Sequence, residues 1–425
     1  MKLYELYDLL VKNYETSSIK KDMDLILNIE KQKYNLDLTK FKAEYIQKYD
    51  TLPTPNITCG ILTFNEERCV DRCLKSVYNI FDEIIVLDSY STDRTVELIN
   101  ESYPKVKVYQ EKWRDDFSFH RNRIMQLATK DWIFFIDADN WLENKETNSI
   151  PRIAKLIEFL NIECVVSPII KESNNHIHYD NRKMIKISSG IKYYGLVHEE
   201  PLLENKQTIP YNLTLKVLLN HDGYESKAVN QQDKNLRNLT LTRKMIEIDS
   251  QNPKWFYFLA NELKNYDEIQ NKSKVIELLE NSIKMYEAHP KLYRHRYLLE
   301  SILLLIEVLF NNKQYSKIAK YLDRLTSIAP NNVDSSYYKS LLIIEDMDKK
   351  VGILIDQLEL LLEGDRISFF NSSKDQIRFI IILMAIRIFD LKKLSIHYNS
   401  LTSEKIKKLV ADNIMGLSNS INPKV

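Results

Sequence analysis

The segment Trp132-Ile133-Phe134-Phe135-Ile136-Asp137-Ala138-Asp139 joins five apolar residues to two carboxylates that stand two positions apart. A short, fully apolar run predicts a strand that is buried on both faces of a parallel sheet. Similar runs precede it at 57–62, 83–88 and 106–109, and helical patterns separate them. Alternating strands and helices predict an α/β domain whose parallel sheet is covered by helices on both faces.

Composition narrows the class of protein. The 425 residues include 60 basic and 59 acidic side chains, a net charge of +1, and 44% are hydrophobic. At about 100–200 residues per domain, the chain predicts two or three folded domains. A nearly neutral chain argues against bulk electrostatic binding of nucleic acid. The sequence contains no run of about 20 apolar residues, the length that a transmembrane span needs. The first residues also lack the apolar core of a secretory signal. We therefore expect a soluble, cytoplasmic protein.

Four cysteines are present, at 59, 69, 73 and 164, and they are too few for a disulfide scaffold in a chain of this length. A second pair at zinc-finger spacing is missing, which argues against a structural zinc site. We therefore expect free or buried thiols.

Three regions differ in their patterns. Residues 1–53 read as a helical segment and end near a proline-containing linker, residues 54–235 carry the α/β pattern, and residues 236–425 are helical throughout. In the last region Pro253, Pro290 and Pro330 are spaced by 37 and 40 residues, between helix pairs. This spacing resembles degenerate tetratricopeptide repeats, whose unit is a helix pair of about 34 residues. An irregular all-α bundle is the alternative.

Polar side chains follow three of the predicted strands, where ligands of open α/β sheets bind. Thr63, Asn65 and Glu66 follow the first strand, and Asp88 ends the second. The pair Asp137 and Asp139 follows the fourth; carboxylates at this spacing can share a divalent cation such as Mg²⁺ or Mn²⁺ beside a diphosphate. The alternatives are turn-forming residues and solvated loop acids.

Three further positions carry candidate chemistry. Arg121, near the start of a helix, could meet a phosphate or the carboxylates, or form a surface ion pair. Within 195–201, Glu199 could accept a proton beside His198, or both could lie on a strand edge. His221 could ligate a metal through a neutral ring nitrogen, or serve as a turn residue.

Six segments together, in this order and spacing, resemble an inverting family-2 glycosyltransferase of the GT-A fold: 57–77, 83–95, 113–123, 131–142, 195–201 and 220–224. The resemblance implies a Rossmann-like nucleotide-diphospho-sugar transferase domain, and a tetratricopeptide-like tail fits it. More narrowly, 83–93, 111–122 and 197–201 resemble the peptide cysteine S-glycosyltransferases that modify glycocin bacteriocin precursors, as in sublancin and thurandacin biosynthesis.

The resemblance implies a role for each matching residue. Those implied at the nucleotide-sugar pocket are Thr63, Asn65, Glu66, Asp88, Ser89, Arg121, Asp137, Ala138 and Asp139. Asp139 and His221 would hold the divalent metal, and Glu199 would act as the base with His198 adjacent. Many family-2 enzymes carry a Glu-Asp base motif on a later helix and a Q-x-x-R-W element, and neither is evident in this sequence.

The implied reaction moves a sugar, expected to be glucose, from a UDP-sugar to a cysteine thiol of a bacteriocin precursor peptide, with serine as a further acceptor. The helical tail would select the peptide, or form a homodimer face. Two alternatives stay open from the residues alone: a family-2 transferase that acts on a lipid-linked or cell-envelope glycan, and a helical-repeat adaptor with an inactive transferase domain.

Overall fold

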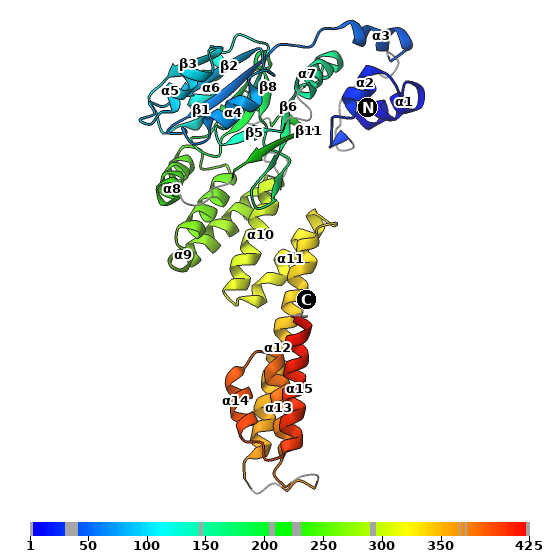
Figure 1. Cartoon of the computed structure of the whole chain (residues 1–425), viewed down its shortest axis with the longest axis vertical. Coiled ribbons are helices and arrows are strands. Elements are labelled where there is room, and N and C mark those ends of the chain that lie inside the picture. The colour runs from blue at the N-terminus through cyan, green and yellow to red at the C-terminus, as the bar shows by residue number, and fades with distance from the viewer. Residues whose placement is uncertain are drawn as a thin grey trace. The chain divides into compact units, whose positions relative to one another are not determined.

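The computed structural model describes residues 3–29, 41–143, 148–203, 209–222, 231–289, 295–364, 367–369 and 372–421. The chain forms two compact units, Met1–Leu304 and Leu305–Val425 (Figure 1). All strands of the described residues lie in the first unit. Its helices are α1 (Leu3–Asn13), α2 (Ser18–Met23), α3 (Ala43–Thr51), α4 (Val70–Val77), α5 (Thr95–Ser102), α6 (Phe117–Leu127), α7 (Ser149–Leu160), α8 (Gln231–Ile248), α9 (Lys254–Ala288) and the start of α10 (His295–Asn311).

A nine-stranded sheet forms the centre of this unit, in the order β3-β2-β1-β4-β8-β6-β11-β5, with β7 beside β6. Its strands are β1 (Ile57–Thr63), β2 (Glu83–Asp88), β3 (Val106–Gln110), β4 (Trp132–Phe135), β5 (Asn140–Leu142), β6 (Cys164–Lys171), β7 (Ile177–His178), β8 (Met184–Lys186) and β11 (Tyr211–His221). A separate two-stranded sheet pairs β9 (Ile191–Tyr194) with β10 (Glu200–Leu203). The four strands predicted from apolar runs are all present.

The predicted parallel sheet is present, but it also contains antiparallel strands. Strands β3, β2, β1 and β4 pair in parallel, as do β6 and β11, whereas β8 runs antiparallel to β4 and β6, β7 to β6, and β5 to β11. The chain turns back from β6 into β7 and β8 through residues 172–176, and a short turn of this kind joins antiparallel strands. Only residues 136–139 separate β4 from β5, so the Asp137–Asp139 segment is a tight turn at the edge of the sheet.

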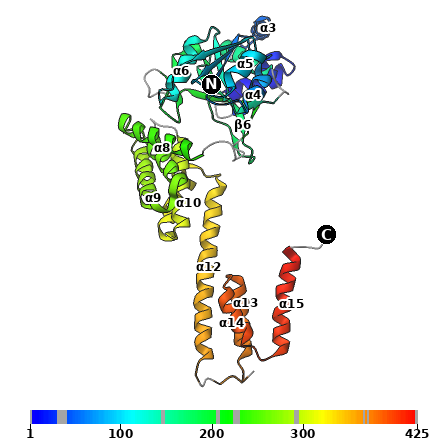
Figure 2. The same cartoon turned by 60° about the vertical axis from the view of Figure 1, so that its left-hand side comes forward.

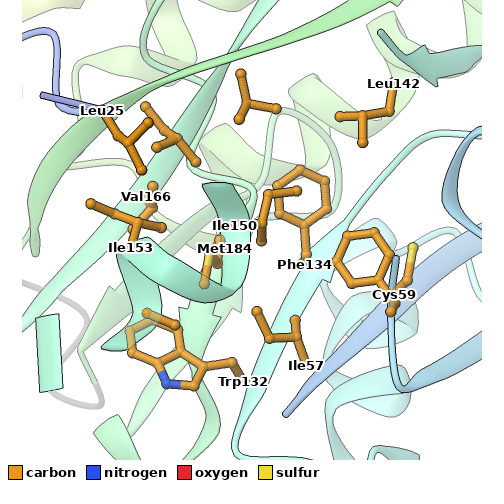
Figure 3. Close-up of a cluster of buried hydrophobic side chains, with 14 of the residues drawn as sticks. Leu25, Ile57, Cys59, Trp132, Phe134, Leu142, Ile150, Ile153, Val166 and Met184 are labelled. Carbon is orange, nitrogen blue, oxygen red and sulfur yellow. The ribbon is translucent and has the colours of Figure 1, made fainter. Parts of the chain in front are cut away.

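Alternate residues of the central strands enter two different cores, as the two-residue period of a strand requires. Trp132 and Phe134 pack with α4, α5, α7 and the N-terminal helices, and Figure 3 shows them among the aliphatic side chains of that face. Ile133 and Phe135 pack on the other face with α6. A Cβ on Gly60 would lie 2.9 Å from Ile124 of α6, so glycine allows this helix to approach β1 closely.

The N-terminal helices belong to the first core. Leu6, Ile19 and Met23 are fully buried in it, and Leu27 donates its backbone NH to Thr214 of β11 at 2.8 Å. Asp22 accepts hydrogen bonds from Arg152 of α7 and Tyr49 of α3. All four cysteines are buried and unbridged, which confirms the expected free thiols.

The helices after residue 231 lie side by side as α8, α9 and α10 (Figures 1 and 2). Pro253 caps α9, and Asp267, with non-helical φ and ψ, breaks that helix into two parts. The second unit holds the rest of α10 with α11 (Ile318–Ile328), α12 (Val333–Leu362), α13 (Asp375–Arg387), α14 (Leu391–Asn399) and α15 (Glu404–Ile421). Pro290 lies outside the described residues, and the repeat assignment and the predicted domain bounds stay predictions. Among the described helices, none is both long and apolar enough to cross a bilayer.

Candidate active site

The loops that follow β1 and β2 are bonded to each other. Asn65, in the left-handed region at φ 57°, accepts the backbone NH of Thr92 with its side-chain oxygen at 2.8 Å. Asp88 is fully buried and accepts hydrogen bonds from the Thr63 hydroxyl at 3.0 Å and from the backbone NH of Ser91 at 2.9 Å. These contacts fix the position of both loops, and a direct contact of Asp88 with a nucleotide stays a prediction.

Neighbouring residues of the same loops leave some surface open. Ser89 donates its backbone NH to the Thr63 carbonyl at 2.9 Å, which holds the start of the second loop against β1. Glu66 accepts a hydrogen bond from the Cys69 thiol at 3.0 Å, and burial raises the pKa of Glu66. The aromatic side chains of Phe64 and Tyr90 are 56% and 54% exposed. Large exposed rings beside a predicted nucleotide pocket can stack on a base. Sequence reasoning did not single out these two aromatic residues.

Asp137 lies between two cations. Its carboxylate accepts hydrogen bonds from Arg121 of α6 at 3.1 Å and from Lys183 at 2.5 Å. Burial alone raises the pKa of Asp137, but the charges of Lys183 and Arg121 outweigh burial and hold that pKa well below its ordinary value. Arg121 also donates to Glu199 at 2.5 Å, so one buried guanidinium joins two of the predicted site carboxylates.

Asp139 has a different set of partners. Its Oδ2 lies 3.0 Å from Nε2 of His221, at the end of β11, and Ala138 between the two aspartates is buried. The other ring nitrogen of His221 is hydrogen-bonded to Glu172, at the end of β6. The hydrogen bond to Asp139 is the main cause that raises the pKa of His221 to about 9. The structure therefore brings together Asp139 and His221, which are 82 residues apart in the sequence.

The donor set around Asp139 fits a hard divalent cation that is shared with a substrate. Among the described residues, no three His, Cys, Asp or Glu side chains are grouped so that they could hold a metal by themselves. Mg²⁺ and its relatives, however, commonly take one or two protein ligands and complete their shell with phosphate and water oxygens. Glu172 behind His221 matches the carboxylate–histidine arrangement that orients metal-ligating imidazoles.

The segment from Gly195 to Pro201 faces the same region. Gly195 has φ of 119°, and a Cβ there would lie 2.8 Å from Trp255 of α9, so only glycine fits this close approach. Glu199 points to Arg121, whereas the ring of His198 stacks on Phe258 of α9 with centroids 3.8 Å apart. His198 is thus held against a helix, and it lines the same cavity as Glu199.

A cavity of about 320 Å³ connects these groups. Asp137, Glu199 and His221 lie on its lining, together with Phe258 of α9 and Tyr297 of α10. Two buried amide oxygens on the same lining, Oδ1 of Asn140 and Oδ1 of Asn181, accept no hydrogen bond from the described residues. A polar ligand that brings hydroxyl donors would satisfy both oxygens.

Sequence reasoning missed several residues of the site. Lys183 and Glu172 each belong to a segment without a motif; the antiparallel pairing of β8 with β4 brings Lys183 to the site, and the parallel pairing of β6 with β11 brings Glu172 beside His221. Asp222, in the segment 220–224, binds Arg68 at 2.6 Å and also Arg72, which ties the end of β11 to α4. Gly223 and Tyr224 of that motif lie outside the described residues.

Comparison with known proteins identifies the family. Residues 58–219 match the model of glycosyl transferase family 2. The SPbeta prophage-derived glycosyltransferase SunS of Bacillus subtilis (strain 168) is 35% identical over 408 residues, which cover 96% of this chain and 95% of SunS. An uncharacterized glycosyltransferase of Rickettsia bellii is 38% identical over 102 residues, 24% of this chain and 34% of its own.

Among solved structures, S. aureus TarS 1-349 aligns with a TM-score of 0.35 and 14% identity, over 67% of this chain and 92% of that chain. The relative SunS matches almost from end to end, and the family model covers residues 58–219, which include Asp139 and most of the sheet and end two residues before His221. The chain therefore belongs to the family-2 glycosyltransferases with the GT-A fold, and it is a glycosyltransferase.

Proposed function

We propose that this enzyme transfers a hexosyl group, expected to be glucose, from a UDP-sugar to a cysteine thiol of a bacteriocin precursor peptide, with inversion at the anomeric carbon. The observation that carries the proposal is that one member of each of two pairs lines the same cavity: His221, which is paired with Asp139, and Glu199, which is paired with Arg121. The first pair supplies ligands for a cation beside a diphosphate, and the second supplies a cation and a proton acceptor.

The donor would be held by the first pair and by the loops after β1 and β2. A divalent cation, Mg²⁺ or Mn²⁺, would supply charge stabilisation for the leaving diphosphate. Asp139 and His221 would hold it, after the His221 ring has lost the proton that its raised pKa favours. Arg121 donates toward the same region from a buried position, where a fixed charge acts more strongly than in water.

Asn140 and Asn181 would accept hydrogen bonds from sugar hydroxyls, since both residues line the cavity and their buried amide oxygens have no partner among the described residues. This recognition would favour a hydroxyl-rich donor over one that lacks the matching group, because a buried acceptor left unpaired costs about 1–3 kcal/mol. The sugar identity itself, glucose, rests on the resemblance.

At the anomeric carbon, the chemical step would form a carbon–sulfur bond and break a carbon–oxygen bond. The cysteine sulfur attacks the anomeric carbon, the bond from that carbon to the diphosphate oxygen breaks, and UDP leaves with the electron pair. The thiol proton passes to Glu199, whose carboxylate lies on the cavity lining. A free thiol has a pKa of about 8.5 and is already partly ionised at neutral pH, so a carboxylate paired with Arg121 is a sufficient base.

The helices after residue 231 would select the peptide, because Phe258 of α9 and Tyr297 of α10 already line the cavity. A helical peptide could dock on such helices and present a cysteine on a loop. The second unit could provide a homodimer face, since α12 exposes Ile343, Ile344 and Met347. The cytoplasmic location stays a prediction.

The test is a product mass. The purified full chain is incubated with Mn²⁺, a panel of UDP-sugars, and synthetic peptides that carry one cysteine between two amphipathic helices. With UDP-glucose, the expected product is a peptide heavier by one hexosyl residue. Its linkage should resist alkaline elimination, which an S-glycoside withstands better than an O-glycoside does. The matched control replaces the cysteine by alanine, and transfer to that peptide, or to a lipid-linked acceptor alone, would contradict the proposal.

A further inference from the structure

We propose that one face of α9 acts as a positioning element that holds the loop His198–Glu200 so that Glu199 faces Arg121. Lys254, Phe258 and Glu262 are spaced by four residues and therefore lie on one side of the helix. All three contact this loop. The inference rests on the proposed role of Glu199 and assigns to these three residues a function that no motif in the sequence indicated.

His198 is held on two sides by this face. Its ring lies parallel to the ring of Phe258, with an interplanar angle of 3° and centroids 3.8 Å apart. Its Nε2 lies 3.0 Å from Oε1 of Glu262, which is itself 7% exposed. Because stacking fixes the plane of the ring and the hydrogen bond fixes its rotation within that plane, the imidazole has one orientation.

Glu200, on the other side of Glu199, is held in the same way. Lys254 donates to Glu200 at 3.0 Å and to the backbone carbonyl of His198 at 3.4 Å, and its side chain is 4% exposed. Tyr297 of α10 donates to the second oxygen of Glu200 at 3.1 Å. Both neighbours of Glu199 are therefore attached to the helices, whereas Glu199 itself points away to Arg121.

The backbone of the loop needs such support. His198 has φ of 50°, in the left-handed region that a residue with a Cβ enters at a cost. Gly195 at φ 119° lies against Trp255, the residue next to Lys254. A residue other than glycine keeps this conformation only when the surrounding contacts over-determine it, and Phe258, Glu262 and Lys254 of α9 supply such contacts to His198.

The consequence concerns the position of Glu199. Proton transfer and the attack of the sulfur both depend on the distance from this carboxylate, and a shift of about 1 Å can cost up to 10²-fold in rate. If α9 releases the loop, Glu199 loses its alignment, while the loops after β1 and β2, which are hydrogen-bonded to each other, keep theirs. Turnover should fall and donor affinity should not.

The experiment compares four substitutions in α9 of the full chain. Glu262→Leu and Phe258→Leu remove the hydrogen bond and the stack, whereas Glu262→Gln and Phe258→Tyr keep an acceptor and a ring. Glu277→Leu, at an exposed site of the same helix, is the matched control. Two readouts are measured: kcat and KM for the UDP-sugar, and amide hydrogen exchange of the peptide that covers 195–201.

For both Leu variants at 258 and 262 we expect exchange in 195–201 about tenfold faster, kcat lower by about 10–100-fold, and KM for the donor within about twofold. The Gln and Tyr variants should keep the slow exchange of 195–201, and only the control at 277 should resemble the unmodified enzyme in both readouts. Unchanged exchange in both Leu variants would overturn the proposal, as would faster exchange with unchanged kcat. If the unmodified enzyme transfers no sugar at all, the proposed function fails, and the exchange readout still decides whether α9 holds the loop.

Discussion

Asp137 and Asp139 differ by two positions in the sequence and lie in opposite electrostatic surroundings. Asp137 meets the positive charges of Arg121 and Lys183, whereas Asp139 meets the His221 ring, with Glu172 behind it. A motif of two carboxylates suggests two equivalent metal ligands. The surroundings instead favour the division of roles that we propose: Asp137 would be a counter-ion that sets the position of Arg121, and Asp139 would be the ligand for a cation.

The largest effect should follow from Asp139→Asn, which weakens the ligand pair with His221. We expect transfer to fall by about 10²–10³-fold, because the charge on the leaving diphosphate loses its stabilisation. Binding of UDP should lose its dependence on Mn²⁺ in calorimetry, while thermal stability stays close to that of the unmodified enzyme. Activity within threefold of the original would show that Asp139 is not the open carboxylate of the pair.

Next in size is the effect of Glu199→Gln on different acceptors. A serine hydroxyl needs a base far more than a thiol does, since a thiol is partly ionised at neutral pH. Transfer to a serine peptide should fall by about 10²-fold and transfer to the matched cysteine peptide by about tenfold or less. Equal losses on the two acceptors, measured by competition in one reaction, would argue against Glu199 as the base.

Glu172→Gln tests the residue behind His221. Removing such a partner typically costs 10–100-fold in metal affinity, and we expect a loss of about that size in Mn²⁺ titrations at saturating UDP. His178→Asn is the matched control, because His178 contacts the other oxygen of Glu172 at 3.2 Å and leaves the bond to His221 in place. A loss as large in the control as in Glu172→Gln would mean that the hairpin as a whole, and not the hydrogen bond, sets the affinity.

The smallest expected effect is on the free energy of unfolding. Here the substitution of Asp137 should have the larger effect, whereas for activity the substitution of Asp139 should. Asp137→Asn leaves the buried cations Arg121 and Lys183 without a full counter-charge. The cost should be about 2 kcal/mol in the free energy of unfolding, below the usual range for a buried pair because the Asp137 side chain is 41% exposed and water screens it. Urea unfolding measures the change, and Asp139→Asn should cost less.

Glu97→Gln serves as the surface control for that comparison, since its partner Arg94 and Glu97 itself are both more than half exposed. An exposed pair contributes little to stability, because water and salt screen its charges. A loss in Asp137→Asn no larger than in this control would remove the distinction between the two aspartates.

The fold was predictable to the extent that it depends on local pattern. The apolar runs at 57–62, 83–88 and 132–136 become strands that are buried on both faces, and the run at 106–109 becomes the edge strand β3, whose side chains are mostly exposed. The antiparallel strands β5 and β8 were not predicted, since they pair with β11 and β4, which are distant in the sequence, and local composition does not indicate such pairing.

For the site, the pattern predicted residues at strand ends but not their partners. The approach of Asp139 and His221 was expected, and the structure places them 3.0 Å apart. Lys183, Glu172 and the α9 residues stand in segments without any motif, and they reach the site only through long-range pairing of strands and helices. The role of His198 could not be read from its position next to Glu199, because the direction of its ring depends on a helix 60 residues later.

The most direct test of the central claim is anomalous diffraction from crystals grown with Mn²⁺ and UDP. The account predicts one Mn²⁺ peak within bonding distance of both the Asp139 carboxylate and Nε2 of His221, with Asp137 still paired to Arg121 and Lys183. A crystal with UDP bound and its Mn²⁺ peak on Asp137, or nowhere near His221, would contradict it.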